Sequence, residues 1–262
     1  MKIITLLTDF SLKDGYVAQM KGVISSITDA RIIDITHDIQ PHNIREAAFI
    51  LKNTVPHYPV GTVHLAIVDP GVGTERKGLI ITTKSQILVG PDNGVLIPTA
   101  KLLGDLTVYK IKNGEYMLKN ISDTFHGRDV FAPMAAHIVN GVSFDKLGDK
   151  IDKFVDLDFK EANVSKKDVT GNVIYFDHFG NIITNIDGAS VKEIFDYDKK
   201  IKISVKNKQK EAIFVKSYGF AKKGQLLATI GSNNFLEISI NQGNAAKKLD
   251  LKPDDEVKIL FS

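Results

Sequence analysis

Two stretches of the sequence place charged side chains beside glycines, an arrangement that suits chemistry at the edge of a folded unit. In "IVDPGVGTER", residues 67–76, an apolar run ends at Asp69, a Pro-Gly turn follows, and Arg76 closes the stretch. In "DTFHGRDVFAP", residues 123–133, His126 stands at the expected start of a helix, where backbone N–H groups and the positive end of the helix dipole gather. The alternatives are an ordinary turn with a solvated ion pair, and a histidine on the surface or in the core.

The glycines after Asp69 do not form a phosphate-binding loop. Such a loop needs a glycine, four residues and then Gly-Lys-Ser or Gly-Lys-Thr opening a helix. Here the residues that follow, "GLIITTK" at 78–84, have the pattern of a strand. Asp69 instead ends a predicted strand of an α/β sheet, at the edge where such sheets bind ligands. Pro70 and the glycines form a turn that can return Arg76 to that edge.

A third stretch, "YFDHFGNIITNI" at residues 175–186, carries Asp177, Phe179 and Asn181 around a glycine. A carboxylate, an aromatic face and an amide suit a flat, polar, partly cationic ligand. Further on, "GSNNFLEISINQGNAA" at residues 231–246 offers backbone and amide groups that can contact a purine edge. The alternatives are a strand with its turn and a hairpin with a glycine-rich loop.

Two kinds of element must position these residues. Strands predicted at 2–9, 30–36 and 62–69 alternate with helices at 15–27, with Asp14 as its cap, and at 43–55, with Asn43 as its cap. A hairpin at 78–90 and a helix at 127–141 complete an α/β domain with a mostly parallel central sheet flanked by helices. From residue 165 onward, short strand-like runs separated by turns predict an antiparallel barrel or sandwich. We therefore expect domains at 1–160 and 168–262.

Composition excludes several classes of protein. The chain has no cysteine, so disulfides, thiolate zinc sites and a cysteine nucleophile are absent. Its net charge of +3 comes mostly from scattered lysines, whereas nucleic-acid binding favours clustered arginines, so we expect no nucleic-acid partner. The histidines and carboxylates lack metal-site spacing, which predicts no metal. With no signal peptide and no apolar run long enough for a bilayer, we expect a cytoplasmic protein that does not bind membranes.

The motifs, taken in order along nearly the whole chain, resemble those of a known family. They read "TDFSLKDGYVAQMKGVI", "DITHDIQPHNIREAAFIL", "HLAIVDPGVGTERKGLII", "GPDNGVL", "TFHGRDVFAP", "DHFGNIITNI" and "LEISINQGNAA". This set is similar to the S-adenosyl-L-methionine (SAM) hydroxide adenosyltransferases, or adenosine-forming SAM hydrolases, which are relatives of SAM-dependent fluorinases and chlorinases. The resemblance implies an α/β domain followed by a small β-barrel, assembled as a homotrimer with each site between neighbouring chains.

The resemblance also assigns roles to individual residues. It implies that Asp69, Arg76 and His126 activate the water and that SAM is the substrate, with no cofactor. Asn233 occupies a position where halogenating relatives carry an arginine, so the contact there is open. The substrate-binding residues that the family implies are Asp9 at the ribose, Phe125 and Gly127 at the reacting centre, Asp177, Phe179 and Asn181 at the methionine and purine ends, and Tyr218, Ser232 and Ala245.

The expected reaction is displacement of the sulfonium from C5′ of SAM by water or hydroxide, which gives adenosine and L-methionine. Asp69 and a neutral His126 would accept hydrogen bonds from the water or take its proton, while Arg76 favours hydroxide electrostatically. A halide-using enzyme is a rival, but a carboxylate beside the nucleophile repels an anion. A non-catalytic SAM or adenosine sensor is the other alternative.

Overall fold

The computed structural model describes residues 2–157, 159–165, 167–206 and 208–261 of the chain. It divides into two compact units, Met1–Asp158 and Phe159–Ser262, each with its own hydrophobic core. Among the described residues, no helix has both the length and the apolar character required to cross a bilayer.

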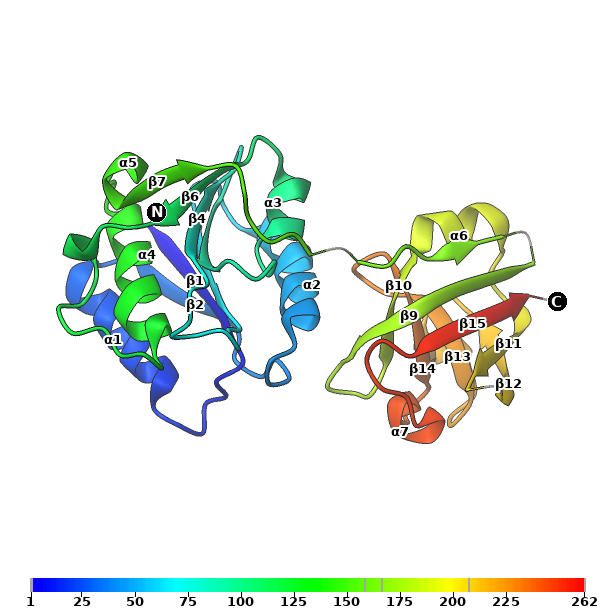
Figure 1. The fold of residues 1–262 in the computed structure, drawn as a ribbon. Helices are drawn as coiled ribbons and strands as arrows, with labels where there is room; N and C mark the ends of the chain where they lie inside the picture. Colours follow the sequence, from blue (N-terminus) through cyan, green and yellow to red (C-terminus); the bar gives the residue numbers. More distant parts are fainter. Residues whose placement is uncertain (1, 158, 166, 207, 262) are drawn as a thin grey trace. The chain divides into compact units, whose positions relative to one another are not determined.

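The first unit is built on a seven-stranded sheet in the order β2-β1-β3-β5-β4-β6-β7. The strands β2, β1, β3 and β5 run parallel to one another, and β4, β6 and β7 continue the sheet beyond β5 with antiparallel pairings. Figure 1 shows α1 and α4 on one side of this sheet and α2 and α3 on the other. The strand bounds are β1 Ile3–Thr8, β2 Arg31–Thr36, β3 Val63–Ile67, β4 Gly78–Thr82, β5 Ile87–Pro91, β6 Thr107–Ile111 and β7 Gly148–Ile151.

The central strands β1 and β3 are buried along their whole length, as expected for parallel strands covered by helices on both faces. The helix α2 begins as predicted, because Asn43 Oδ1 accepts a hydrogen bond from Glu46 N at 3.1 Å. The predicted cap of α1 is wrong: this helix begins at Tyr16, its N-cap residue is Gly15, and no side chain caps it. The helix bounds are α1 Tyr16–Ile27, α2 Ile44–Thr54, α3 Ile97–Leu103, α4 Ala132–Val139 and α5 Phe144–Leu147.

The second unit is a closed barrel of seven strands in the order β10-β14-β13-β12-β11-β15-β9, which the β9–β10 pairing closes. The short strand β8, Asn163–Val164, adds to the outside of β9. Inward side chains form the core, as the alternating pattern predicts. The strand bounds are β9 Asp168–Phe176, β10 Ile182–Asp187, β11 Lys199–Val205, β12 Lys208–Phe214, β13 Leu226–Ile230, β14 Phe235–Ile240 and β15 Glu256–Phe261.

The fold class predicted from the sequence is therefore confirmed, with one refinement in the barrel. All pairings are antiparallel except β12 with β13, which are parallel. Residues 215–225 carry the chain from the end of β12 back to the start of β13, and they include a 3₁₀ turn at Tyr218–Phe220. Two short helices complete the unit, α6 Gly188–Ile194 and α7 Ala245–Leu249.

Candidate active site

The turn after β3 brings Arg76 back toward Asp69. The carbonyl oxygen of Asp69 accepts a hydrogen bond from Val72 N at 3.2 Å, which tightens the turn. Gly73 has a φ of +77°, and a Cβ placed there would overlap the backbone carbonyl oxygen of Asp123. A glycine is therefore required, because it lets the turn lie directly on the loop that precedes His126.

Arg76 joins the other two candidate catalytic residues. Its Nε lies 2.9 Å from each carboxylate oxygen of Asp69, and its Nη2 lies 2.5 Å from Oδ2. The same Nη2 lies 2.9 Å from Nδ1 of His126. The Arg76 and Asp69 side chains are only 13% and 5% exposed, and the guanidinium carbon lies 5.1 Å from the centre of the Phe131 ring. The structure thus brings His126, from the second motif, to Asp69 and Arg76, which the sequence placed together in the first.

The contact with Arg76 fixes the protonation state of His126. A guanidinium only donates hydrogen bonds, so Nδ1 of His126 must accept and the ring proton must be on Nε2. Burial lowers the pKa of His126 below the usual histidine value, and the charge of Arg76 lowers this pKa further. His126 immediately precedes the π-helical turn Gly127–Phe131 that leads into α4, close to the helix start that the sequence predicts.

Asp9 follows β1 and lies at the same sheet edge as Asp69. Thr8 is opposite Ile67 in the parallel β1–β3 register, so the two acids follow neighbouring strand ends. The Oδ2 atom of Asp9 accepts a hydrogen bond from the backbone N of His42 at 2.9 Å. Asp9 lies at this sheet edge without a hydrogen bond to Asp69, Arg76 or His126 in the described residues.

Phe125 and Gly127 lie beside an aromatic cluster. The rings of Phe10, Tyr16 and Phe125 meet edge to face with centroids 5.2 to 6.1 Å apart. A Cβ at Gly127 would come within 3.3 Å of the Phe125 ring, so the glycine allows this ring to approach the backbone. A cavity of about 420 Å³ opens here, lined by Phe10, Tyr16, Gln19, Ser122, Thr124, Phe125 and Arg128.

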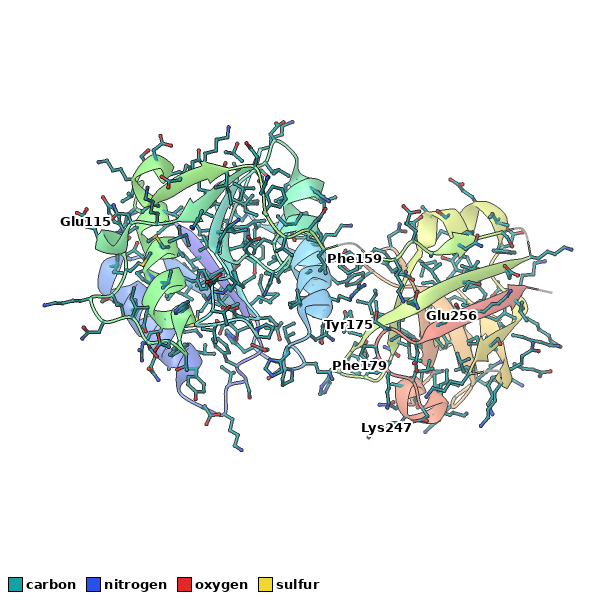
Figure 2. All side chains as sticks on the ribbon, in the orientation of Figure 1. Glu115, Phe159, Tyr175, Phe179, Lys247 and Glu256 are labelled. Atoms are coloured by element: carbon teal, nitrogen blue, oxygen red, sulfur yellow. The ribbon has the colours of Figure 1, made fainter. Side chains whose placement is uncertain are left out.

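In the second unit, the β9–β10 hairpin joins Asp177 to Asn181. The Oδ1 atom of Asp177 accepts hydrogen bonds from the backbone N atoms of Phe179 and Asn181 at 2.9 and 2.8 Å. Its Oδ2 accepts a third from the Asn181 side-chain amide at 2.8 Å. Phe179, labelled in Figure 2, is 73% exposed at the tip of this hairpin. An exposed aromatic ring and a fixed carboxylate–amide pair are thus presented together.

Two adjoining cavities surround this hairpin, and both include Asp177 and Tyr218. The first, which we call the hairpin pocket, has a volume of about 550 Å³ and is lined by Asp177, Phe179, Asn181, Tyr218, Ile240, Asn241, Gln242 and Gly243. The second, which we call the carboxylate pocket, has a volume of about 430 Å³. It is lined by Tyr175, Asp177, Ile183, Lys216, Ser217, Tyr218, Thr229, Ile230, Gly231, Ser232, Asn233, Phe235 and Glu237.

The remaining family-implied positions have different surroundings. Ser232 lines the carboxylate pocket and is exposed. Ala245 begins α7, and its side chain is fully buried in the barrel core, so only its backbone is available to a ligand. Sequence reasoning missed Glu237, whose carboxylate accepts a hydrogen bond from the Tyr218 hydroxyl at 2.7 Å. An acid within the apolar run "FLEISI" was the available signal.

The candidates thus form one group in each unit. The group in the first unit holds Asp9, Asp69, Arg76, Phe125, His126 and Gly127; that in the second holds Asp177, Phe179, Asn181, Tyr218, Ser232 and Ala245. Within the described ranges, no three His, Cys, Asp or Glu side chains are arranged to hold a metal ion.

Family models match both parts of the chain. The SAM hydroxide adenosyltransferase N-terminal domain matches residues 4–148, and the C-terminal domain matches residues 171–258.

Individual proteins match over almost the full length. The chain is 42% identical to the (R)-S-adenosyl-L-methionine hydrolase of Methanocaldococcus jannaschii, with 100% of this chain and 97% of that protein covered. It is 26% identical to a fluorinase of Nocardia brasiliensis, with 98% and 96% covered. The crystal structure of an uncharacterized conserved protein from Thermotoga maritima matches with a TM-score of 0.93 at 40% identity, covering 98% of this chain and 99% of that one. The chain therefore belongs to the SAM hydroxide adenosyltransferase family.

Proposed function

We propose that this protein hydrolyses SAM to adenosine and L-methionine. Water attacks C5′ of the ribose, the C5′–O bond forms as the C5′–S bond breaks, and the sulfonium leaves as the neutral thioether of methionine. One proton is released. The similar proteins include both SAM hydrolases and fluorinases. The 42% identity to an (R)-SAM hydrolase over the full chain, against 26% to a fluorinase, supports hydrolysis.

The observation that carries the proposal is the cluster of Asp69, Arg76 and His126. A carboxylate beside the nucleophile favours water over a halide, because it accepts a hydrogen bond from water and repels an anion. The guanidinium lies between the carboxylate and the imidazole, so this position already holds a cation. We therefore assign no metal and no cofactor to the reaction.

Each member of the cluster has a distinct role in the proposed mechanism. Nδ1 of His126 is occupied by Arg76, which leaves Nε2–H as a donor to the water oxygen. Asp69 accepts a hydrogen bond from the water and takes its proton, because it is the only anion in the cluster. At the moment of proton transfer, the water oxygen is already bonding to C5′ and resembles a protonated alcohol. A protonated alcohol is a far stronger acid than a carboxylic acid, so Asp69 can accept the proton. Orientation supplies much of the acceleration, since well-oriented groups can gain about 7–11 kcal/mol.

Substrate binding is shared between the two groups of residues. Asp9 accepts hydrogen bonds from the ribose diol, and Phe125 and Gly127 lie beside C5′. The hairpin pocket suits adenine, because Phe179 offers a stacking face and Asn181 an amide. We propose that the chain forms a homotrimer in which the barrel of one chain completes the site of its neighbour.

The test is incubation with SAM in oxygen-18-labelled water, followed by mass spectrometry of the products. We expect methionine without label and adenosine with the label in its 5′-hydroxyl. Label elsewhere, or a product other than adenosine, would contradict attack at C5′. Tight SAM binding without turnover would identify a sensor. A 5′-halogenated nucleoside formed in the presence of halide salts would identify a halogenase.

A further inference from the structure

The motif "GPDNGVL" at residues 90–96 covers the end of β5 and the turn that follows it, and the proposed mechanism does not use it. Within it, the side-chain amide of Asn93 donates a hydrogen bond to the backbone carbonyl oxygen of Val68 at 2.7 Å. The Oδ1 atom of Asn93 accepts one from Val95 N at 3.2 Å, which fixes the side chain on its own turn. Asn93 thus joins the turn after β5 to the residue directly before Asp69.

The Val68 carbonyl depends on this contact. The last residue of β3 that pairs with β1 is Ile67, opposite Thr8, and the pairs with β5 end earlier, so Val68 lies beyond both ladders. Val68 is also 0% exposed. A buried backbone carbonyl without a partner costs free energy comparable to a lost hydrogen bond. The Asn93 amide supplies the partner that the sheet does not.

This carbonyl determines the direction in which Asp69 leaves the strand. A peptide group is planar, so the Val68 carbonyl and the nitrogen and Cα of Asp69 move together. On its other side, the carbonyl oxygen of Asp69 accepts a hydrogen bond from Val72 N. Both peptide groups that flank Asp69 are therefore held, one within its own turn and one by Asn93.

The turn after β5 also holds the other end of the loop 69–76. The backbone N of Asp92 donates a hydrogen bond to the carbonyl oxygen of Lys77, the residue after Arg76, at 2.8 Å. The Asp92 side chain adds to this contact, because its Oδ2 lies 3.8 Å from Lys77 Nζ. The neighbouring residues Asp92 and Asn93 thus bind the two ends of the loop that carries the catalytic candidates.

A glycine lets this turn approach β3 closely. A Cβ at Gly90 would overlap the carbonyl oxygen of Ala66 on β3, so a side chain there would push β5 away from β3. Gly90 does not have a positive φ, so its backbone conformation does not explain the glycine. Close packing of the two strands brings Asn93 within reach of Val68.

We propose that Asn93 is a positioning residue for the displacement at C5′, because its amide holds the Val68–Asp69 peptide group where the Asp69 carboxylate meets Arg76 and the attacking water. This inference rests on the proposed function. The contact that it maintains is short, since Arg76 Nη2 lies 2.5 Å from Asp69 Oδ2. A shifted peptide group would move the carboxylate away from the water without removing it from the site.

The test is Asn93→Asp, which keeps an oxygen for Val95 N but replaces the donor to Val68 with a second acceptor. We expect kcat for SAM to fall by about 10-fold to 100-fold, because a displacement of about 1 Å can cost 100-fold, while KM changes less than about threefold. Asn93→Ala removes the donor without adding a charge and should show the same split. Thermal unfolding shows that each variant is folded.

Asn113 provides a matched control, because it makes the same pair of hydrogen bonds in the turn after β6. Its amide donates to the carbonyl oxygen of Lys146, and its Oδ1 accepts from Glu115 N, both at 3.0 Å. Asn113→Asp should lower the unfolding temperature but leave kcat within about twofold of the wild type. Equal losses of kcat in Asn113→Asp and Asn93→Asp, or full activity in a folded Asn93→Asp enzyme, would overturn the inference.

A measurement that needs no turnover separates this inference from the proposed reaction. The side-chain Nε–H signals in a nitrogen-15 NMR spectrum come from the arginines of the chain, Arg31, Arg45, Arg76 and Arg128. The Arg76 signal is the one that Arg76→Lys removes. Because this Nε–H donates to Asp69, the signal should shift in Asn93→Ala and stay in place in Asn113→Ala.

The two failures are then distinguishable. An unmoved Arg76 signal in Asn93→Ala would overturn the inference, even in an enzyme that hydrolyses SAM. A shifted signal in a protein that does not hydrolyse SAM would support the positioning of Asp69 by Asn93 although the proposed function had failed.

Discussion

At the scale of single residues, the site depends on the shape of one guanidinium. The Nη2 atom of Arg76 contacts both Asp69 and His126, and its Nε atom completes a bidentate contact with the Asp69 carboxylate. Lysine has the same charge but carries its donors on one nitrogen, so it cannot reproduce this fork. Arg76 is therefore a geometric as well as an electrostatic component of the proposed site.

We expect Arg76→Lys to lower kcat by about 100-fold, a loss typical of one misplaced electrostatic group, with little change in KM. Steady-state kinetics with SAM and thermal unfolding give the measurement and its folding control. Arg31→Lys, an exposed substitution on β2, is the matched control and should retain full activity. A fully active Arg76→Lys enzyme would show that charge alone is sufficient.

The pH dependence of the rate tests the protonation state of His126. Burial and the Arg76 charge lower its pKa, so the imidazole is neutral at and somewhat below the usual histidine value of about 6.5. Protonation would place a proton on Nδ1 against the guanidinium. We therefore expect kcat to remain constant as the pH falls to about 6.5 and to decline only below it. A decline centred above pH 6.5 would contradict this assignment.

The sequence predicted the catalytic candidates better than the acid in the carboxylate pocket. Asp69, Arg76 and His126 lie in motifs whose glycines and strand ends mark a ligand-binding edge. Glu237 lies inside the stretch at residues 231–246, but it is on a strand, and Thr229 lies two residues before that stretch on the preceding strand. Their proximity depends on the β13–β14 register, which only the folded barrel provides.

At the scale of elements, the turn after β3 depends on Gly73. We expect Gly73→Ala to destabilise the protein by about 1–2 kcal/mol for the positive φ, and by about 1–3 kcal/mol more for the overlap with the Asp123 carbonyl. Gly61 also has a positive φ but no atom within 4 Å of its Cβ position. Gly61→Ala therefore measures the backbone term alone, and urea unfolding compares the two. Equal losses would show that the turn does not need close contact.

At the centre of the sheet, the buried His64 on β3 makes the stability of the protein depend on pH. Its side chain is buried, its Nδ1 is 2.7 Å from Thr5 Oγ1, and burial lowers its pKa to about 4. Since the unfolded value is about 6.5, the unfolded state binds the proton more strongly. Stability is therefore complete above pH 6.5 and is lost as the pH falls toward 4, by about 3 kcal/mol in all.

We expect denaturant unfolding at pH 7 and at pH 4 to show this loss in the wild type. In His64→Asn, whose amide oxygen can replace Nδ1 as the partner of Thr5, the loss should be about 3 kcal/mol smaller. Other groups titrate equally in both proteins, so the difference isolates His64. An identical pH dependence would show that His64 is hydrated in the folded state.

Element types followed from the sequence more readily than their ends and connections. The buried run of β1 and the alternation in the barrel strands indicated strands correctly, because burial pattern follows backbone period. The start of α1 at Tyr16 was missed because a capping acid stood nearby at Asp14 but made no cap. The parallel β12–β13 pair arises from a crossover loop, which no local pattern encodes.

At the scale of the whole molecule, the order of motifs identifies the family, but assembly is a separate question. The catalytic candidates belong to the first unit, and Asp177 and Asn181 belong to the second. Nothing in a local pattern determines whether the two halves of a site come from one chain or from neighbours. Our proposal of a shared site in a homotrimer is therefore tested by experiment.

We expect activity to return when Asp69→Ala and Asn181→Ala chains, each inactive alone, are unfolded, mixed and refolded together. In a shared site, some interfaces pair the intact first unit of one variant with the intact barrel of the other. For random trimers from equal amounts, this holds at about a quarter of interfaces, because each of the two conditions is met half of the time. The measurement is SAM hydrolysis per chain, with the trimer state checked by light scattering.

The control mixes each variant with itself through the same refolding procedure, which should leave it inactive. Mixing the Asp69→Ala chain with an Arg76→Ala chain is the sharper control, because both changes affect the same half of the site. No interface in that mixture has an intact first unit, so no activity should return whichever chain supplies the barrel. Mixed Asp69→Ala and Asn181→Ala trimers that remain inactive would place the whole site within one chain. The proposed reaction would stand in that case, because the cluster around Arg76 lies entirely in one unit.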